Sequence, residues 1–312
     1  RVDANCAMCY WGLYHALRMR SGERNAYTDQ ALAAEVRLKG HAGKEERLYI
    51  AAAVASDAAD KAARRDGRGG NEKEVAIWRQ VVKRYPKDPQ AKIFLAGSLR
   101  DGYDDAGAPR KGTAEAIALL QEVLKAKPDD SAANHYWIHA VEASAHPEQA
   151  LHSATVLASL APASGHMVHM PGHIFYRVGD YAQAEKWFAA STVVDETYMR
   201  DQHVSVDDDW NYIHNLMYGV ANLMEEGKLQ EAVVLSNKLA SGRGELAATL
   251  YTGSPRDGIA RLDEQLPVAM RLGDWAAIEK MAGASKPDAR LENLNLLAGQ
   301  LKEYASGMLA AQ

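Results

Sequence analysis

Residues 126–169 read AKPDDSAANHYWIHAVEASAHPEQALHSATVLASLAPASGHMVH, and their pattern indicates the fold class. It contains two proline turns, at Pro128 and Pro162, and a helical segment follows each of them. The two prolines are 34 residues apart. A fixed period of this length is typical of stacked helix-turn-helix repeats, in which each repeat buries its apolar face against the next.

Other turns extend the pattern in both directions. RYPKDPQA places Pro86 42 residues before Pro128, and the added length contains the insert DGYDDAGAPRKG. The turns at Gly179 and Gly227 are 48 residues apart, which is one repeat plus 14 residues. The sequence therefore predicts an all-α fold, a tetratricopeptide-type right-handed α-solenoid of about six to seven helix pairs. A single domain over residues 1–312 is the simplest organisation.

Composition agrees with this fold and excludes several functions. Hydrophobic residues make up 47% of the 312 residues, which is enough for a sizeable core. Only three residues of the chain are Phe, which favours helices over strands. Acidic residues outnumber basic ones by 41 to 36, which argues against a nucleic-acid partner. The longest apolar stretches, such as YIAAAVA from Tyr49, are far shorter than the roughly 18 residues of a membrane span, so no span is expected.

The repeat register gathers histidines on one face. In tetratricopeptide proteins, positions 2, 5 and 9 of each repeat project from its first helix into a concave groove. If the turn proline is position 32, repeats begin at Ser131 and Gly165, and a third begins at Ile213 if Gly227 matches Gly179. The groove positions are then Ala132, His135 and His139, followed by His166, His169 and His173, followed by His214, Met217 and Ala221.

These histidines predict a metal site. Neighbouring helices pack about 8–10 Å apart and residues i and i+4 share a face, so the histidine pairs of adjacent repeats should meet across one seam. Imidazoles from facing helices can hold a metal ion at about 2.0–2.1 Å. The expected copper or zinc ligands are His135, His139, His169 and His173, with His166, His214 and Glu142 close by. The alternative is that they bind a peptide carboxylate, or are core histidines whose hydrogen bonds are satisfied by the backbone.

Cys6 and Cys9 form a CxxC near the start of the chain. Haem attachment is disfavoured because Tyr10, and not histidine, follows the second cysteine. Three alternatives stay open for the pair: a disulfide at a helix N-terminus, two free core thiols, or metal ligands. An oxidising compartment would favour the disulfide.

Five stretches carry a family resemblance: NCAMCYWG, NHYWIHAVEASAHPEQA, GHMVHMPGHIFYRVGDYAQA, DETYM and YIHN. In order and spacing they resemble a large group of bacterial, usually exported tetratricopeptide-repeat proteins with HYxIHAVE and HMPxHIYxRVG signatures. The resemblance covers about residues 5–240 and implies the fold and a periplasmic or secreted location. The family pattern carries over to Cys6, Cys9, His135, His139, Glu142, His166, His169, His173 and His214. The chain departs from it at Gly172, where Ser is expected, and at Met217, where a second histidine is common.

Three functions fit these features. The first is a solenoid whose groove holds copper or zinc for storage, redox chemistry or hydrolysis; such an enzyme would be a metal-dependent oxidase or hydrolase, with Glu142 as the candidate base. The second is a metal-free scaffold that clamps a peptide or partner protein in the groove. The third is a structural component of a surface assembly.

Overall fold

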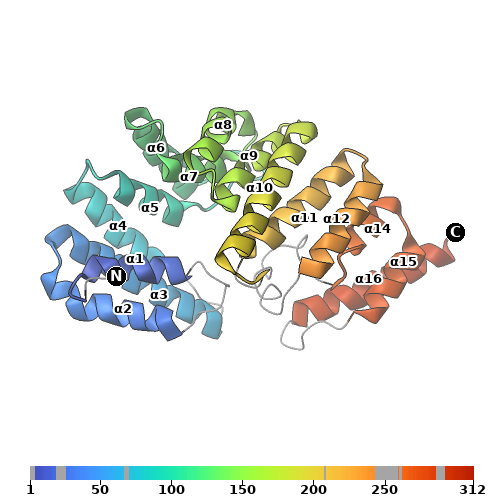
Figure 1. The fold of residues 1–312 in the computed structure, drawn as a ribbon, viewed down its shortest axis with the longest axis horizontal. Helices are drawn as coiled ribbons and strands as arrows, with labels where there is room; N and C mark the ends of the chain where they lie inside the picture. The colour runs from blue at the N-terminus through green and yellow to red at the C-terminus, as the bar shows by residue number, and fades with distance from the viewer. Residues whose placement is uncertain are drawn as a thin grey trace. The chain divides into compact units, whose positions relative to one another are not determined.

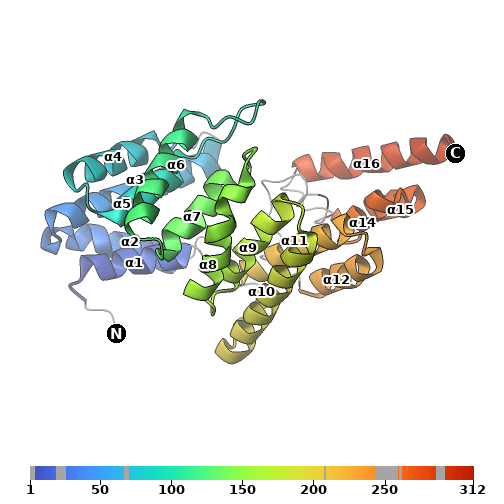
Figure 2. The same cartoon turned by 90° about the horizontal axis from the view of Figure 1, so that it is seen from above.

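The structure, a computed structural model, describes residues 4–18, 26–66, 70–206, 209–242, 259, 262–285 and 292–312. These segments contain fifteen α-helices, two short 3-10 helices and no β-strand (Figures 1 and 2). The predicted all-α class is therefore confirmed. No helix in the described segments combines the length and the hydropathy that a membrane span needs.

The contacts divide the chain into two compact units, Arg1–Ala161 and Pro162–Gln312. The boundary falls at the proline turn that the repeat period identified. The single domain expected over residues 1–312 stays a prediction.

In unit 1, consecutive helices pack as pairs, α1 with α2, α3 with α4, α5 with α6, and α7 with α8. Their bounds are α1 Ala7–Arg18, α2 Ala26–Leu38, α3 Lys44–Asp66, α4 Glu72–Arg84, α5 Pro89–Leu99, α6 Lys111–Ala126, α7 Ser131–Val141 and α8 Leu151–Leu160. The 3-10 helices η1 (Lys39–His41) and η2 (Pro147–Ala150) lie in two of the connections.

Unit 2 continues the same arrangement, with α9 against α10, α11 against α12, and α14 against α15, which also packs against α16. Their bounds are α9 Gly165–Arg177, α10 Tyr181–Gln202, α11 Trp210–Glu225, α12 Leu229–Gly242, α14 Leu266–Leu272, α15 Trp275–Ala284 and α16 Glu292–Ala310. Seven pairs are thus described over the two units, within the predicted six to seven. Within each unit, helices pack against their neighbours in the sequence, which is the arrangement of an α-solenoid.

Aspartate caps explain where the repeats begin. Asp88 precedes α5 and accepts a hydrogen bond from the Gln90 amide, and Asp130 precedes α7 and accepts one from the Ala133 amide. Helices α7 and α9 begin at Ser131 and Gly165, as the register predicted. Helix α11 begins at Trp210, three residues before the expected Ile213, because Asp209 caps it through the Tyr212 amide.

Gly172 departs from the family pattern for a steric reason. A Cβ atom at this position of α9 would lie 2.3 Å from Cε1 of Phe188 on α10. Serine cannot be accommodated there without moving the Phe188 ring. Glycine therefore allows α10 to pack closely against α9, the helix that carries His166, His169 and His173.

Candidate functional site

Three imidazoles meet between α9 and α11 in unit 2. His169 and His173 lie one turn apart on α9 and are 0% and 5% exposed, and half-buried His214 projects from α11. One ring nitrogen from each lies within 4.8 Å of the other two. Two histidines at i and i+4 on one helix, with a third from a neighbouring helix, are an arrangement that can converge on a single metal ion.

The side chain of Asn215 fixes how the His169 ring is protonated. Its amide nitrogen donates to the Phe188 carbonyl and to Oγ1 of Thr192, both at 2.8 Å. Thr192 Oγ1 itself donates to the Phe188 carbonyl at 3.0 Å, so it accepts from Asn215. The amide oxygen must then face His169, and Nδ1 of His169 donates to it at 2.8 Å.

A neutral imidazole with its proton on Nδ1 carries its lone pair on Nε2. Nε2 of His169 lies 2.7 Å from Nε2 of His173, where His173 can donate its N–H to that lone pair. The two rings are nearly perpendicular, with centroids 4.6 Å apart. The only lone pair of the His169 ring therefore points into the cluster.

His166 repeats this arrangement one turn earlier on α9. Its Nδ1 lies 3.0 Å from Oδ1 of Asn211, whose amide nitrogen donates to Asp195 at 2.8 Å. Asn211 is thereby oriented as Asn215 is, and His166 also has its proton on Nδ1. The His166 ring centroid is 6.0 Å from that of His169 and 6.4 Å from that of His214, so His166 lies beside the triad.

Burial keeps His169 neutral. Desolvation lowers its pKa well below the ordinary value, and the neighbouring His173, His214 and His166 lower it further. Only neutral imidazole binds a metal ion, so the same environment that disfavours a proton on Nε2 leaves this atom available as a ligand.

A buried carboxyl group supports Asn211. Asp195 on α10 is 3% exposed, and burial, reinforced by the charge of Asp209, raises its pKa to about 7. The hydrogen bond from Asn211 opposes this shift. Near neutral pH the folded chain therefore holds Asp195 partly protonated, whereas the unfolded chain ionises it at about 3.9.

This difference predicts a pH-dependent stability. Because the pKa is raised on folding, the stabilisation is complete below the unfolded pKa and is lost as the pH rises through about 7. Wild type should lose about 1.4 kcal/mol of unfolding free energy per pH unit between about 4 and 7 relative to Asp195→Asn, which cannot ionise. The pKa of His169 is lowered on folding, so its contribution to stability changes with pH in the opposite direction. His169 is present in both proteins, so the difference between their unfolding free energies reports Asp195 alone. Urea denaturation at several pH values measures it; parallel pH profiles would contradict it.

The other predicted ligands lie in unit 1. His135 and His139 are neighbours on α7 with ring centroids 4.7 Å apart, and Nδ1 of His139 lies 2.8 Å from Oε1 of Glu142. Within unit 2 the structure brings together His169, His173 and His214, with His166 beside them. Within unit 1 it places His135, His139 and Glu142 next to one another. The seam expected between the two groups joins different units, and the predicted four-histidine set stays a prediction.

Sequence reasoning missed the asparagines. Asn211 and Asn215 lie one turn apart in WNYIHN and are 4% and 1% exposed. Asparagine is seldom fully buried, so two of them at i and i+4 on an apolar helix face were a signal for a polar network. Their partners on α10, such as Thr192, are not recognisable before the helices are placed together.

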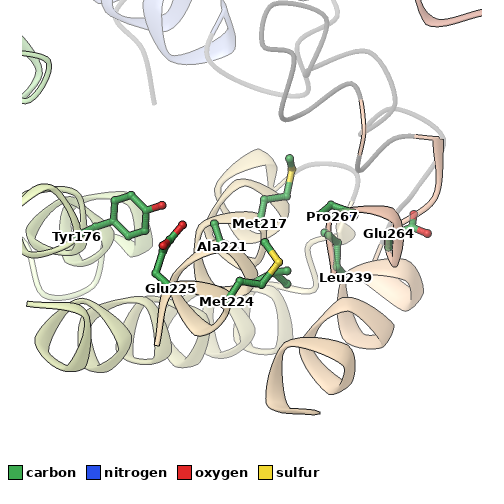
Figure 3. A pocket seen from close by; sticks show the side chains of 9 residues that line it. Tyr176, Met217, Ala221, Met224, Glu225, Leu239, Glu264 and Pro267 are labelled. Carbon is green, nitrogen blue, oxygen red and sulfur yellow. The ribbon is translucent and has the colours of Figure 1, made fainter. Parts of the chain in front are cut away.

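A pocket lies along α11 (Figure 3). Met217 and Ala221, two of the predicted groove positions, line it together with Leu239 of α12 and Pro267 of α14. Tyr176, Met224 and Glu225 complete much of the wall. The groove register thus identifies residues that face a cavity on this helix.

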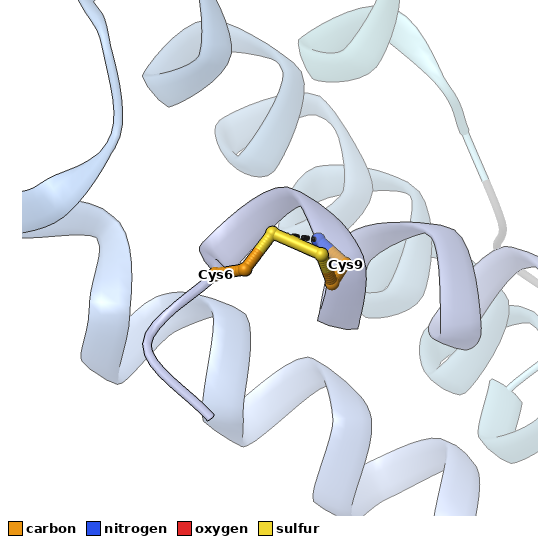
Figure 4. The surroundings of a disulfide bond; sticks show 2 residues. All are labelled: Cys6 and Cys9. Carbon is orange, nitrogen blue, oxygen red and sulfur yellow. Dashed lines mark hydrogen bonds between the residues drawn. A yellow bond between two sulfur atoms is a disulfide. The ribbon is translucent and has the colours of Figure 1, made fainter. Parts of the chain in front are cut away.

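Cys6 and Cys9 are joined by a disulfide at the start of α1 (Figure 4). The Cys9 amide also donates to Sγ of Cys6 at 3.1 Å. Of the three alternatives for this pair, the structure contains the bridge at a helix N-terminus.

No family model matches the chain, and no curated protein matches it. Among solved structures, the chain is similar to one described as "MamA RS-1 ArsTM double mutant", with a TM-score of 0.43 and 12% sequence identity. The match covers 64% of this chain and 95% of that one. Similarity at this level has no bearing on function.

Proposed function

We propose that this helical-repeat protein binds one copper or zinc ion through His169, His173 and His214. The observation that carries the proposal is the orientation of His169 by Asn215, which leaves Nε2 as the ring's lone-pair nitrogen inside the cluster. A histidine that donates its other N–H to a fixed acceptor is the usual arrangement around protein metal ions.

Ligand chemistry selects the metal. Three neutral imidazoles suit zinc and copper, whereas calcium and magnesium prefer oxygen ligands. Tetrahedral ligands at about 2.0–2.1 Å are about 3.3 Å from one another. To bind one ion, Nε2 of His169 and Nε2 of His173 would have to separate from 2.7 Å to about 3.3 Å. His173 would also have to carry its proton on Nδ1 instead of Nε2, so that its Nε2 offers a lone pair.

Three protein ligands leave a fourth position for water or substrate, which is the pattern of catalytic zinc sites. Zinc at such a site supplies an activated water for hydrolysis, and copper supplies one-electron chemistry. Tyr218 stacks against His173 with centroids 4.4 Å apart and forms one wall of the site. Glu142, the base expected from the sequence, belongs to unit 1 and keeps that role only as a prediction.

A metal-free scaffold is the second candidate. It is favoured by the hydrogen bond between the Nε2 atoms of His169 and His173, because this bond satisfies both nitrogens without an ion. In that case the histidines and asparagines form a structural network, and the pocket along α11 binds a protein or peptide. A role as a structural component of a surface assembly would use the same solenoid.

Metal analysis separates the two candidates. We expect the purified protein, reconstituted with Zn²⁺ or Cu²⁺ and desalted, to retain close to one equivalent in elemental analysis. Retention should decrease as the pH falls below about 6.5, where imidazoles ordinarily protonate. Failure to retain either metal at neutral pH would leave the scaffold as the function.

We also propose a periplasmic or secreted location, supported by the family resemblance and by the Cys6–Cys9 bridge. Protein isolated without reductant should then show no alkylated cysteine by intact mass, and two after reduction. Fractionation of the cells that make this protein naturally tests export directly. Two free thiols in freshly exported protein would contradict the bridge.

A further inference from the structure

A second pocket lies in unit 1 and is formed by α2, η1, α3 and α4, none of which carries a predicted metal ligand. Its volume is about 720 Å³, within the roughly 300–1,000 Å³ of small-molecule sites. Its apolar lining consists of Val36, Ile50, Ala51, Val54 and Ile77. Arg47, Ile50, Ala51 and Val54 have the i, i+3, i+4, i+7 spacing of one helix face, so the floor runs along two turns of α3.

Every charged residue that lines this pocket is positive. These are Arg37, Lys39, Arg47 and Lys73, although acidic residues outnumber basic ones in the chain. Among the residues that the structure describes, Arg37, Lys39 and Lys73 have no carboxylate partner. Clustered cations without counter-ions raise the local concentration of anions.

Arg47 is held in place by the protein itself. Its Nε donates to the Ala42 carbonyl at 2.9 Å and its Nη2 to the Gly40 carbonyl at 3.0 Å. A guanidinium has five N–H donors in a fixed plane, so others are left for a ligand. The connection between α2 and α3 thus presents a positioned donor beside the apolar floor.

We infer that this pocket binds a small amphipathic anion, with an apolar body on the α3 floor and a carboxylate or similar acidic group at the cations. The four positive side chains favour a ligand with a negative charge, and the apolar floor favours a ligand whose remaining part is apolar. A protein partner fits less well, because stable protein interfaces use about 20–30 residues a side and this pocket is lined by ten.

The probe for the test is decanoate, titrated calorimetrically into the full chain, with 1-decanol as its uncharged counterpart. We expect saturable binding of decanoate and at least tenfold weaker binding of 1-decanol. The double variant Lys39→Glu/Lys73→Glu and the single variant Val54→Asp should each weaken decanoate binding at least tenfold. All three positions are exposed, so these changes leave the fold intact.

Matched controls lie elsewhere on the surface. Lys83→Glu/Lys87→Glu repeats the charge change outside the pocket, and Val234→Asp repeats the apolar change at a site that is 69% exposed. Both should bind decanoate within twofold of wild type. The inference is overturned if decanoate binding does not saturate below about 1 mM, or if 1-decanol binds as tightly as decanoate. It is also overturned if the control variants lose as much affinity for decanoate as the pocket variants do. Binding of an acidic peptide in place of decanoate would also overturn it.

Discussion

Replacing His169 with alanine is expected to weaken zinc binding at least 100-fold. His169 is the fully buried member of the triad and the one whose Asn215 hydrogen bond leaves Nε2 as its lone-pair atom. Its loss would leave two imidazoles, too few for a tetrahedral protein site. Competition against a chromophoric chelator measures the dissociation constant of the variant and of wild type.

Loss of folding must be separated from loss of a ligand. His169→Ala also leaves the Asn215 oxygen without its donor, so helicity and thermal unfolding are measured on the metal-free protein. His214→Ala is the second variant, because His214 is only half-buried and comes from α11. His41→Ala and His152→Ala change exposed histidines outside the cluster and should leave the zinc affinity unchanged. Equal losses in all four variants would contradict the assignment.

Much of the helical framework follows from local sequence signals. The turns at Pro128 and Pro162 stop one helix, and the residues after them begin the next, so Ser131 and Gly165 were predictable as helix starts. Helix α11 begins three residues before the position that the register predicted, because Asp209 caps it and the repeat period does not indicate this cap. The period of the sequence identifies the repeat, whereas the first residue of a helix depends on whether one particular side chain caps it.

The histidines of α9 follow from the same register. Their spacing placed His169 and His173 on one face, and the structure agrees. The orientation of each ring depends on side chains from two other helices, Asn215 on α11 and Thr192 on α10, which only packing brings together. The division of the contacts into two units at Pro162 is likewise a property of packing between distant segments, and the continuous repeat pattern does not indicate it.

Replacing Asn215 with leucine should lower the zinc affinity about 10–100-fold, the usual effect of removing a hydrogen-bond partner of a metal-binding histidine. Leucine has nearly the same shape but cannot accept the Nδ1 proton of His169. The ring would then bury an unsatisfied N–H, or move its proton to Nε2 and lose the lone pair that faces the cluster. The chelator competition used for His169 reports the change.

Asn222 offers a matched control on the same helix. It is also fully buried, and its amide donates to the Tyr181 carbonyl and to Glu226, away from the histidines. Asn222→Leu and Asn215→Leu should each cost about 1–3 kcal/mol of unfolding free energy, because each leaves buried polar groups unpaired. Only Asn215→Leu should weaken zinc binding. If both variants bind zinc as wild type does, Asn215 is a packing residue and the orientation of His169 does not depend on it; if both lose affinity equally, the loss reflects stability and not the ligand.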